Sequence, residues 1–295
     1  MEYNLVQVLD EVVDKAVDSC SHAGFRGRPR VYGLKQMIKA FLLIPYLELG
    51  NELDLVRYLN RNPRMLASLG FASLPHRTTF HRFRKRYGFL LFDLCEQLRM
   101  QLPQDRVYGI DATLEEKKDR DSKWGYSKSK GWVFGFKFHI LSDLQLGLPV
   151  RVLVTAANTH DSQMMPELVC GIGLGDYIMD SGYDSELNHQ KIKSEGGFPA
   201  ICRNKRRGDR QGKTLRNQLQ KNKHRKKMLK HRWKVEPVNE QYKSILQLPT
   251  RLFQGIQSVF FYAQLTLLRL LTQALWTIKR GKPQLAKITT LFKHR

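Results

Sequence analysis

The chain has 295 residues, enough for one large domain or two smaller ones, and 42% of them are hydrophobic, a share that excludes wholesale disorder. Its 50 Lys and Arg against 27 Asp and Glu give a formal net charge of +23. A protein tolerates such self-repulsion when a polyanion binds it, so the composition favours nucleic acid as the partner, with an anionic membrane surface as the alternative.

The membrane alternative depends on one apolar segment, Gly255 to Ile278, which carries Arg269 near its middle. An Arg at the centre of a bilayer costs roughly 2.5–3.5 kcal/mol, so we predict a buried helix and no membrane partner. The acidic first 18 residues do not form a signal peptide pattern. The four cysteines lie far apart without a Cys-x-x-Cys pair, which argues against a zinc ribbon and favours free thiols in the cytoplasm.

Residues 1–100 are predicted to be helical, because apolar residues recur with a helical period over 3–17, 33–49 and 52–60. A further helix is expected over 76–87, with Thr78 or Thr79 as its N-cap and with Phe80 and Phe83 on one buried face. Its other faces carry four cations: Arg82, Arg84, Lys85 and Arg86. A basic helix after a short helix and a turn is typical of a helix-turn-helix DNA-binding region, although a solvated charged helix would have the same composition.

Two more segments are strongly basic. Arg26-Gly-Arg-Pro-Arg30 fits either an element that lies in the minor groove of A/T-rich DNA or a basic linker. Residues 203–234 hold 15 Lys and Arg and a single acid, with no sustained apolar period. This stretch, which includes Lys205, Arg206 and Arg207, predicts a mobile or partly helical arm that contacts DNA; a solvated charge run is the alternative.

The texture changes after residue 106. Strands are predicted over 107–110, 132–141 and 149–157, then a helix from Asp161, a strand over 177–180, a helix over 185–194 and a strand over 198–202. This element order is that of the ribonuclease H-like fold. We therefore expect an α/β domain whose mixed five-stranded sheet is flanked by helices, preceded by an all-α N-terminal DNA-binding region.

Three acidic residues stand out by position. Asp111 and Asp180 each end a predicted strand, and Glu236 lies in a predicted helix. At 100° per residue, Arg232, Glu236, Asn239 and Lys243 share one stripe about 60° wide, which suits a face that holds a metal and binds phosphates; a surface ladder of salt bridges is the alternative. Because Pro237 disfavours helical geometry at the residue before it, the helix either kinks there or begins at Pro237, and in the second case Arg232 leaves the stripe.

These residue types suit phosphodiester chemistry. Two Mg²⁺ ions about 3.5–4 Å apart neutralise a scissile phosphate, activate a water or a 3′-hydroxyl and stabilise the leaving oxygen. Mg²⁺ prefers hard oxygen ligands and keeps several waters, so two or three carboxylates suffice to hold it.

In this order, Asp111, Asp180 and Glu236 resemble the DDE triad of insertion-sequence transposases, in the branch related to insertion-sequence families 4 and 5. That branch has a Tyr-x2-Arg-x3-Glu-x6-Lys signature; Arg232, Glu236 and Lys243 fit its spacing, but Leu229 stands at the Tyr position. Asn158-Thr-His-Asp-Ser162 is similar to the turn before the first helix of the fold, and Asp180-Ser-Gly-Tyr-Asp184 to the second catalytic motif.

The resemblance implies that Asp111 bridges two Mg²⁺ or Mn²⁺ ions, that Asp180 and Glu236 each help to hold one, and that Arg232 and Lys243 contact DNA phosphates. Asn239, on the same stripe, is expected at the DNA as well, whereas His160 and Asp161 are expected to form a structural helix start. The implied partners are double-stranded DNA, as terminal inverted repeats and target, and a second copy of the chain in a homodimer. The implied location is the nucleoid of a prokaryotic cytoplasm.

We therefore predict three regions: a helical DNA-binding region over 1–100, a catalytic domain over 101–280 with a basic insertion over 203–231, and a basic tail over 281–295. The predicted function is cut-and-paste transposition, which combines metal-dependent cleavage at element ends with strand transfer into target DNA. The alternatives are a ribonuclease H-like cellular nuclease and an inactive transposase retained as a DNA-binding protein. Short inverted repeats flanking the gene would favour the first function.

Overall fold

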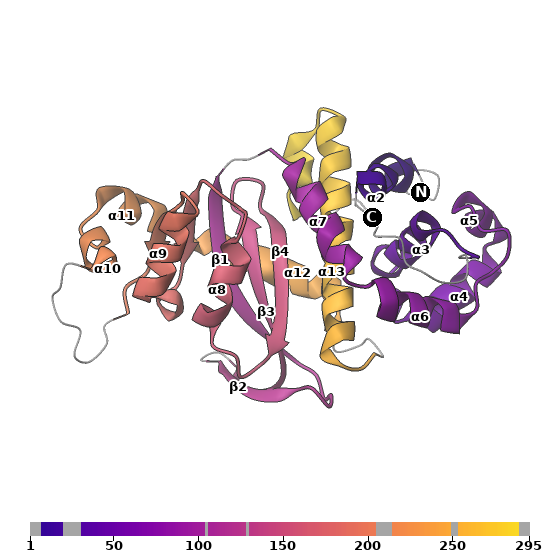
Figure 1. The fold of residues 1–295 in the computed structure, drawn as a ribbon, viewed down its shortest axis with the longest axis horizontal. Helices are drawn as coiled ribbons and strands as arrows, with labels where there is room; N and C mark the ends of the chain where they lie inside the picture. The colour runs from indigo at the N-terminus through magenta and orange to yellow at the C-terminus, as the bar shows by residue number, and fades with distance from the viewer. Residues whose placement is uncertain are drawn as a thin grey trace. The chain divides into compact units, whose positions relative to one another are not determined.

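The computed structural model describes residues 7–19, 31–103, 106–127, 130–204, 214–248 and 253–288 (Figure 1). They form two compact units. Unit 1 contains the described parts of 1–102 and of 245–286, and unit 2 contains those of 103–244 with residues 287 and 288. Residues 245–280, which the sequence analysis grouped with the catalytic domain, thus lie in unit 1.

Unit 1 is helical, and the three helices predicted over 3–60 are present within its described residues. Its elements are η1 (Leu9–Asp14, a π-helix), α2 (Lys15–Ser19), α3 (Leu34–Tyr46), α4 (Glu52–Arg61), α5 (Pro63–Ser68), α6 (Arg77–Tyr87), α7 (Leu90–Met100), α13 (Ile256–Lys279) and η5 (Pro283–Ala286).

Helix α13 is the buried helix that the sequence predicts. Nearly every side chain from Ser258 to Leu275 is buried, because α13 packs against α3 and α7 within the unit. Arg269 donates a hydrogen bond to the Pro45 carbonyl oxygen and lies 5.0 Å from the Tyr46 ring centroid, so the protein itself solvates this charge. Within the described residues, none of the helices combines the length and hydropathy that a bilayer span requires.

Helix α6 has the predicted buried face. The Phe41 ring lies 5.5 Å from that of Phe80, 5.8 Å from Phe83 and 5.0 Å from Phe261 of α13, measured between ring centroids. The N-cap differs from the expectation, because the helix begins at Arg77 and the His76 side chain accepts the hydrogen bond of the Thr78 N–H.

The four cations of α6 separate into two kinds. Arg82, Lys85 and Arg86 are exposed. Arg84 is nearly buried; its Nε lies 2.6 Å from a Glu52 carboxylate oxygen, and its Nη1 donates to the Ser258 hydroxyl. Its charge is therefore neutralised inside unit 1, at odds with the expectation that all four face DNA.

Unit 2 is a mixed sheet of six strands: β1 (Val107–Glu116), β2 (Lys123–Ser127), β3 (Gly131–Asp143), β4 (Leu148–Ala156), β5 (Asp176–Met179) and β6 (Phe198–Ile201). The strand order is β2-β3-β1-β5-β6, with β4 also paired to β3. The β1–β3, β2–β3 and β3–β4 pairs are antiparallel, and the β1–β5 and β5–β6 pairs are parallel. The five predicted strands are all present in a ribonuclease H-like connectivity, and the prediction missed only β2, whose sequence Lys-Trp-Gly-Tyr-Ser contains no aliphatic side chain.

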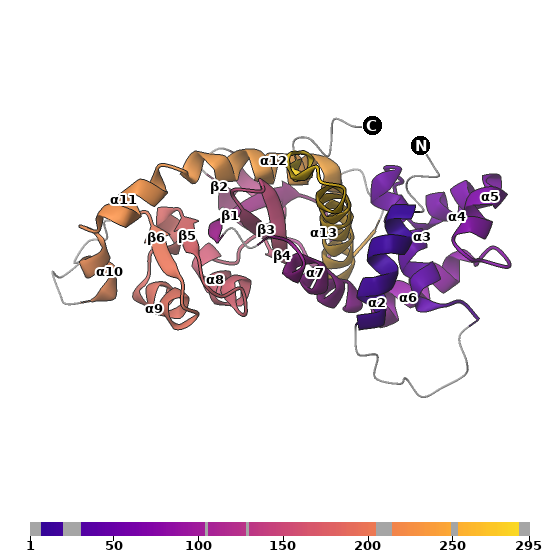
Figure 2. The ribbon, with the colours of Figure 1, turned by 90° about the horizontal axis from the view of Figure 1, so that it is seen from above.

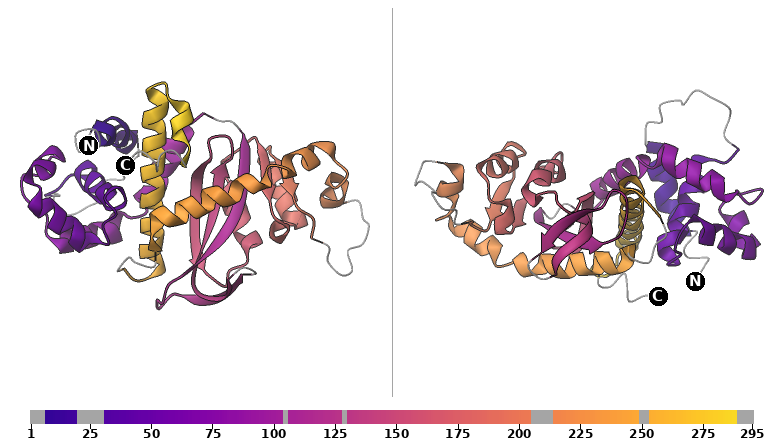
Figure 3. Two further views of the ribbon diagram at one scale, coloured as in Figure 1. Left: turned by 180° about the vertical axis from the view of Figure 1, so that it is seen from behind. Right: turned by 90° about the horizontal axis from the view of Figure 1, so that it is seen from below.

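Helices cover both faces of this sheet. They are α8 (Asp161–Val169), η2 (Ser181–Tyr183), α9 (Glu186–Ser194), α10 (Leu215–Leu219), α11 (Lys223–Leu229), η3 (Arg232–Lys234) and α12 (Val235–Leu246). Helices α8 and α9 lie on one face and α11 and α12 on the other (Figure 2). Seen from behind, α12 crosses the strands (Figure 3). The described cysteines, Cys95, Cys170 and Cys202, are free thiols, as predicted.

The two kinds of cation on α6 predict different effects on stability. Arg84→Ala should lower the free energy of unfolding by about 3 kcal/mol, because it leaves the Glu52 carboxylate buried without its partner. Arg82→Ala should change it by less than about 0.5 kcal/mol, because Arg82 is exposed. Urea denaturation followed by circular dichroism measures both, and equal stabilities would contradict the buried pairing of Arg84.

Candidate metal and DNA site

Asp111 lies on β1, inside unit 2. The backbone N–H of Ala112 donates to its Oδ1 at 2.8 Å, and the Asn239 Nδ2 donates to its Oδ2 at 3.2 Å. Burial raises the pKa of Asp111 to about 6; the negative charges of Asp161 and Asp180 add to this rise, and the two hydrogen bonds oppose it. The carboxylate is thus held in a place where negative charge accumulates.

Asp180 follows β5, the parallel neighbour of β1. Ile110 of β1 pairs with Met179 of β5. The next residues along the sequence, Asp111 and Asp180, therefore lie side by side. The Asp180 side chain is 53% exposed, and its Oδ1 lies 3.6 Å from the Arg232 Nη1. The register of the parallel pair thus brings the two predicted aspartates together. Asp111, which was expected to end its strand, instead lies inside β1, because the pairing with β3 continues to Glu116 after the pairing with β5 has ended at Ile110.

Glu236 is exposed in the first turn of α12, and close packing ties that turn to β1. Gly109 leaves room for it: a Cβ there would lie 2.5 Å from the Val235 Cγ2. Since Gly109 is two residues before Asp111 and Val235 is next to Glu236, the absent side chain brings the two acidic positions near each other.

The predicted stripe faces the sheet. Its Arg232 reaches Asp180, its Asn239 reaches Asp111, and the Lys243 Nζ lies 3.6 Å from a carboxylate oxygen of Glu115 on β1. Asn239 is only 2% exposed, so it orients Asp111 from a buried position.

The helix start resolves the question raised by Pro237. Helix α12 begins at Val235 and not at Pro237, and Arg232 lies in η3, directly before it. Pro237 lies in the first turn, where its missing N–H costs no helical hydrogen bond. Leu229, at the Tyr position of the signature, packs against an apolar cluster that contains Ile178 and Val235.

Asp161 was expected to have a structural role only, but it also acts on Asp111. His160 is the N-cap of α8, as expected of a structural helix start. The Asp161 carboxylate, however, lies 2.8 Å from the Lys137 Nζ and raises the pKa of Asp111 more than Asp180 does. The motif Asn158-Thr-His-Asp-Ser162 was the available signal, but only the packing of α8 on β1 and β3 shows that this charge acts on the site.

Two buried polar atoms near these carboxylates have no hydrogen-bond partner in the part of the chain that the structure describes. They are the Oδ1 of Asn239 and the hydroxyl of Tyr183, whose side chain is 1% exposed. Burial raises the pKa of Tyr183, and the charges of Asp161, Asp111 and Asp180 raise it further. The Tyr183 hydroxyl is therefore a protonated donor beside three aspartates.

The donor set fits a hard divalent cation, because carboxylate, carboxamide and hydroxyl oxygens surround Asp111. The fit is incomplete in one respect: over the described ranges, no three His, Cys, Asp or Glu residues lie close enough together to hold one ion. Asp111 and Asp180 are adjacent. Residues near Glu236 contact both of them, since Asn239 bonds to Asp111 and Arg232 pairs with Asp180, but Glu236 itself does not complete a cluster.

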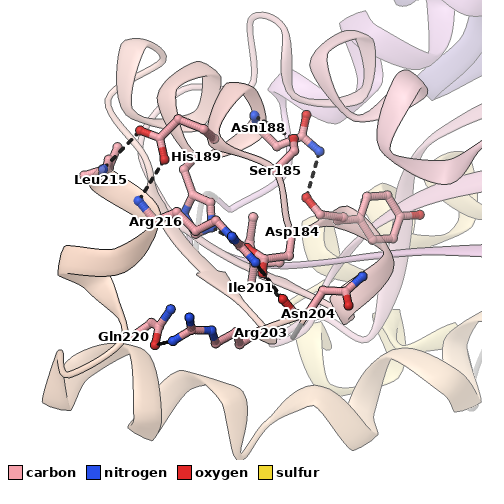
Figure 4. Close-up of polar contacts among 12 residues, drawn as sticks. Asp184, Ser185, Asn188, His189, Ile201, Arg203, Asn204, Leu215, Arg216 and Gln220 are labelled. Carbon is pink, nitrogen blue, oxygen red and sulfur yellow. Dashed lines mark hydrogen bonds and ion pairs between the residues drawn. The ribbon is translucent and has the colours of Figure 1, made fainter. Parts of the chain in front are cut away.

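A buried network fixes the segment after Asp180 (Figure 4). Asp184, 2% exposed, accepts hydrogen bonds from His189 at 3.1 Å and from the Asn204 N–H at 2.8 Å, and it lies 2.7 Å from the Arg216 Nη2. Although burial alone raises the pKa of Asp184, these hydrogen bonds lower it overall, so the carboxylate stays ionised. Glu186 accepts the backbone N–H groups of Leu215 and Arg216 at the start of α10.

This network uses part of the predicted basic arm. Arg216 pairs with Asp184, and Arg225 donates to the Ile201 carbonyl oxygen, so both serve internal contacts. The described part of the arm, from Thr214 onwards, is partly helical, as predicted. The predicted DNA-binding residues Lys205, Arg206 and Arg207, and the Arg26–Arg30 element, lie outside the described residues.

The raised pKa of Asp111 predicts a pH dependence of stability. Because it exceeds the usual value of 3.8, the folded metal-free protein keeps a proton that the unfolded chain releases between roughly pH 4 and 6. Stability should therefore fall as the pH rises through this window, and Asp111→Asn, which cannot ionise, should be about 2–3 kcal/mol more stable than the original chain near pH 7.5.

Urea denaturation with a chelator present, near pH 4 and near pH 7.5, measures this difference. The two proteins should converge at the lower pH. A difference that stays constant over the whole range would contradict the assignment of the shift to Asp111.

Comparisons with known proteins identify the family of the chain. A family model described as the transposase DDE domain matches residues 102–271, more than half of the chain, and a second model, described as a transposase domain, matches residues 2–86. Among solved structures, the piggyBac transposase synaptic complex with hairpin DNA is similar with a TM-score of 0.48 and 9% identity, covering 98% of this chain and 76% of that chain. On the match of the family models, the chain belongs to the DDE transposases, enzymes that generally use divalent metal ions to cleave DNA and join its strands.

Proposed function

We propose that this transposase binds its metal ions at Asp111, Asp180 and Glu236. The observation behind the proposal is the packing of the first turn of α12 on β1, where Gly109 admits Val235 and Asn239 holds the Asp111 carboxylate. The Arg232–Asp180 ion pair joins η3, which directly precedes α12, to the residue that follows β5. Carboxylates that share a cation repel one another until the cation neutralises them. This repulsion accounts for the exposed position of Glu236 and contributes to the raised pKa of Asp111.

Asp111, Asp180 and Glu236 would together hold two Mg²⁺ or Mn²⁺ ions. When bound, they activate the attacking water or 3′-hydroxyl and stabilise the leaving oxygen. Asn239 fixes the orientation of the Asp111 Oδ2 through its hydrogen bond. Tyr183 supplies a hydroxyl donor for an anionic oxygen or a water at the site.

Arg232 and Lys243 bind the phosphates on either side of the bond that is cut. The Arg232–Asp180 pair is half-exposed on both sides, and such pairs contribute only about 0–1 kcal/mol, so Arg232 is readily exchanged from Asp180 to a phosphate. Lys243, on the same stripe as Glu236, forms ion pairs with Glu115 of β1 and with Glu240 of α12.

Unit 1 contributes the exposed cations of α6, Arg82, Lys85 and Arg86, as a phosphate-binding surface of the helical N-terminal region. Each phosphate that they neutralise should add about one to the slope of log affinity against log salt concentration. Lys205, Arg206 and Arg207 of the basic segment lie outside the described residues, and we propose on their charge alone that they also contact DNA phosphates.

The function that follows is cut-and-paste transposition. The enzyme cuts double-stranded DNA at the terminal inverted repeats of its element and joins the freed 3′-hydroxyl to target DNA, as a homodimer that holds both ends. Asp111, Asp180 and Glu236 perform the chemistry, and the cations listed above hold the DNA.

The metal assignment predicts that Asp111→Ala, Asp180→Ala and Glu236→Ala each lower Mg²⁺-dependent cleavage of inverted-repeat DNA at least about a hundredfold while DNA binding is kept, because each variant removes a ligand from ions that supply most of the catalysis. Glu240→Ala is the matched control, since it removes an exposed carboxylate from the same helix and should leave cleavage unchanged. Gel-resolved cleavage and fluorescence anisotropy measure the two quantities.

Full cleavage by Asp111→Ala would overturn the site. Cleavage that follows DNA structure and ignores inverted repeats would identify a cellular nuclease instead. Tight DNA binding without cleavage in Mg²⁺ or Mn²⁺ would identify a DNA-binding protein that has lost its activity.

Two buried tyrosines give a paired prediction. The Tyr177 hydroxyl donates to the Gly173 carbonyl oxygen at 2.7 Å, whereas that of Tyr183 has no partner among the described residues. Tyr183→Phe should therefore keep or raise stability and lower cleavage about tenfold or more. Tyr177→Phe should lose about 1 kcal/mol of stability and keep its cleavage activity.

Thermal denaturation and single-turnover cleavage provide both readings for both variants. If Tyr183→Phe cleaved DNA at the original rate, the hydroxyl would have no part in the site.

A further inference from the structure

Unit 2 exposes an unusual group of aromatic side chains on the β2–β3 hairpin. Trp124 pairs across the strands with Phe134, and Tyr126 with Trp132. Residues two apart on a strand share a face, so all four rings lie on one face of this ribbon. We call these four residues the aromatic face.

The aromatic face is open to solvent. Trp124 is 58% exposed, Tyr126 61% and Trp132 69%. The rings contact one another in two pairs: the centroids of Trp124 and Phe134 are 5.2 Å apart, and those of Tyr126 and Trp132 are 5.5 Å apart. Large aromatic side chains are rarely left on a surface in such a group unless they bind something.

The opposite face of the ribbon explains why these rings stay outside. Val133 packs there into a small core with Leu114 and Ala157. Gly125 lies so close to β4 that a Cβ on it would stand 2.3 Å from the Ala157 carbonyl oxygen. The ribbon is thus fixed to the sheet by its other side, and it presents the rings on a rigid support.

Charge determines which partner fits this surface. The exposed cations Lys123 and Lys130 lie on the ribbon itself, in a chain with a formal net charge of +23, whereas residues 116–122 just before it include equal numbers of acidic and basic residues. A second copy of so basic a chain would bring like charges together. A strand of nucleic acid offers phosphates to the cations and flat bases to the rings, and base–aromatic stacking on a sheet surface needs no particular sequence.

We infer that the aromatic face is a binding surface for unpaired bases of the DNA substrate. This inference rests on the proposed function only where it states the distance between the aromatic face and the cleaved bond. Asp111 pairs with Ile140 on β3, which is six residues from Phe134 and eight from Trp132. At about 3.4 Å per residue this is roughly 20–27 Å, or six to eight base-pair steps of DNA. The unpaired bases therefore lie that far from the phosphodiester bond at Asp111.

The test measures the affinity of the full chain for a single-stranded oligothymidine and for a blunt duplex of the same length, by fluorescence anisotropy at one salt concentration. Trp132→Ala and Trp124→Ala should each weaken binding of the single strand about 5- to 150-fold, the range for the loss of one stacked base, and change duplex binding less than about twofold. Trp132→Phe, which keeps a ring, should retain most of the affinity. Leu187→Ala, at a 76% exposed apolar residue of the same unit, is the control and should bind like the original chain.

Single-strand affinity that Trp132→Ala leaves unchanged would overturn the inference. So would a smaller molar mass of DNA-free Trp132→Ala in analytical ultracentrifugation, because the face would then join two copies of the chain. The outcome is separable from that of the catalytic proposal, since Asp111→Asn should lose cleavage and keep single-strand binding. Loss of single-strand binding in the ribbon variants would stand even if Asp111 proved unnecessary for cleavage.

Discussion

The burial of the Asp111 carboxylate near other carboxylates is the constraint on which this site depends. Parallel pairing of β1 with β5 sets Asp180 beside Asp111, and α8 adds Asp161. Burial raises the pKa of Asp111 most, and the negative charges of Asp161 and Asp180 raise it further. The folded protein therefore holds an ionised Asp111 at an energetic cost, which a divalent cation bound as we propose would relieve.

Helix α12 packs on β1 and carries a third acid, Glu236, which does not complete a cluster with the two aspartates over the described residues. A helix carrying Glu236 could lie at many distances from the sheet, and the missing side chain of Gly109 selects the closest one. The contacts of Arg232, Asn239 and Lys243 then fix the rotation of the helix. Each uses a polar group that faces β1 or β5, so the same stripe that binds the sheet also surrounds the carboxylates.

The large positive charge of the chain is divided between two uses. Some cations form internal contacts, in which a guanidinium group binds buried carboxylate or carbonyl oxygens; they are Arg84, Arg216 and Arg225. Others, such as Arg82 and Lys123, remain at the surface. Net charge alone therefore identifies a polyanionic partner but does not say which cations meet it. The exposed rings of the β2–β3 ribbon add an apolar contribution that charge patterns do not reveal.

The sequence by itself determined the order of the elements, the five more apolar strands, the buried character of α13 and the place of Asp180 directly after a strand, because these follow from local periodicity and from the alternation of strand side chains. It also determined the stripe on α12, since helical rotation is a local property. The tertiary structure alone decided that Asp161 acts on Asp111, that Arg84 is buried against Glu52, that Asn239 is a buried support of Asp111, and that β2 adds a sixth strand. These depend on which surfaces meet in space, and residues far apart along the chain carry no local signal of that meeting.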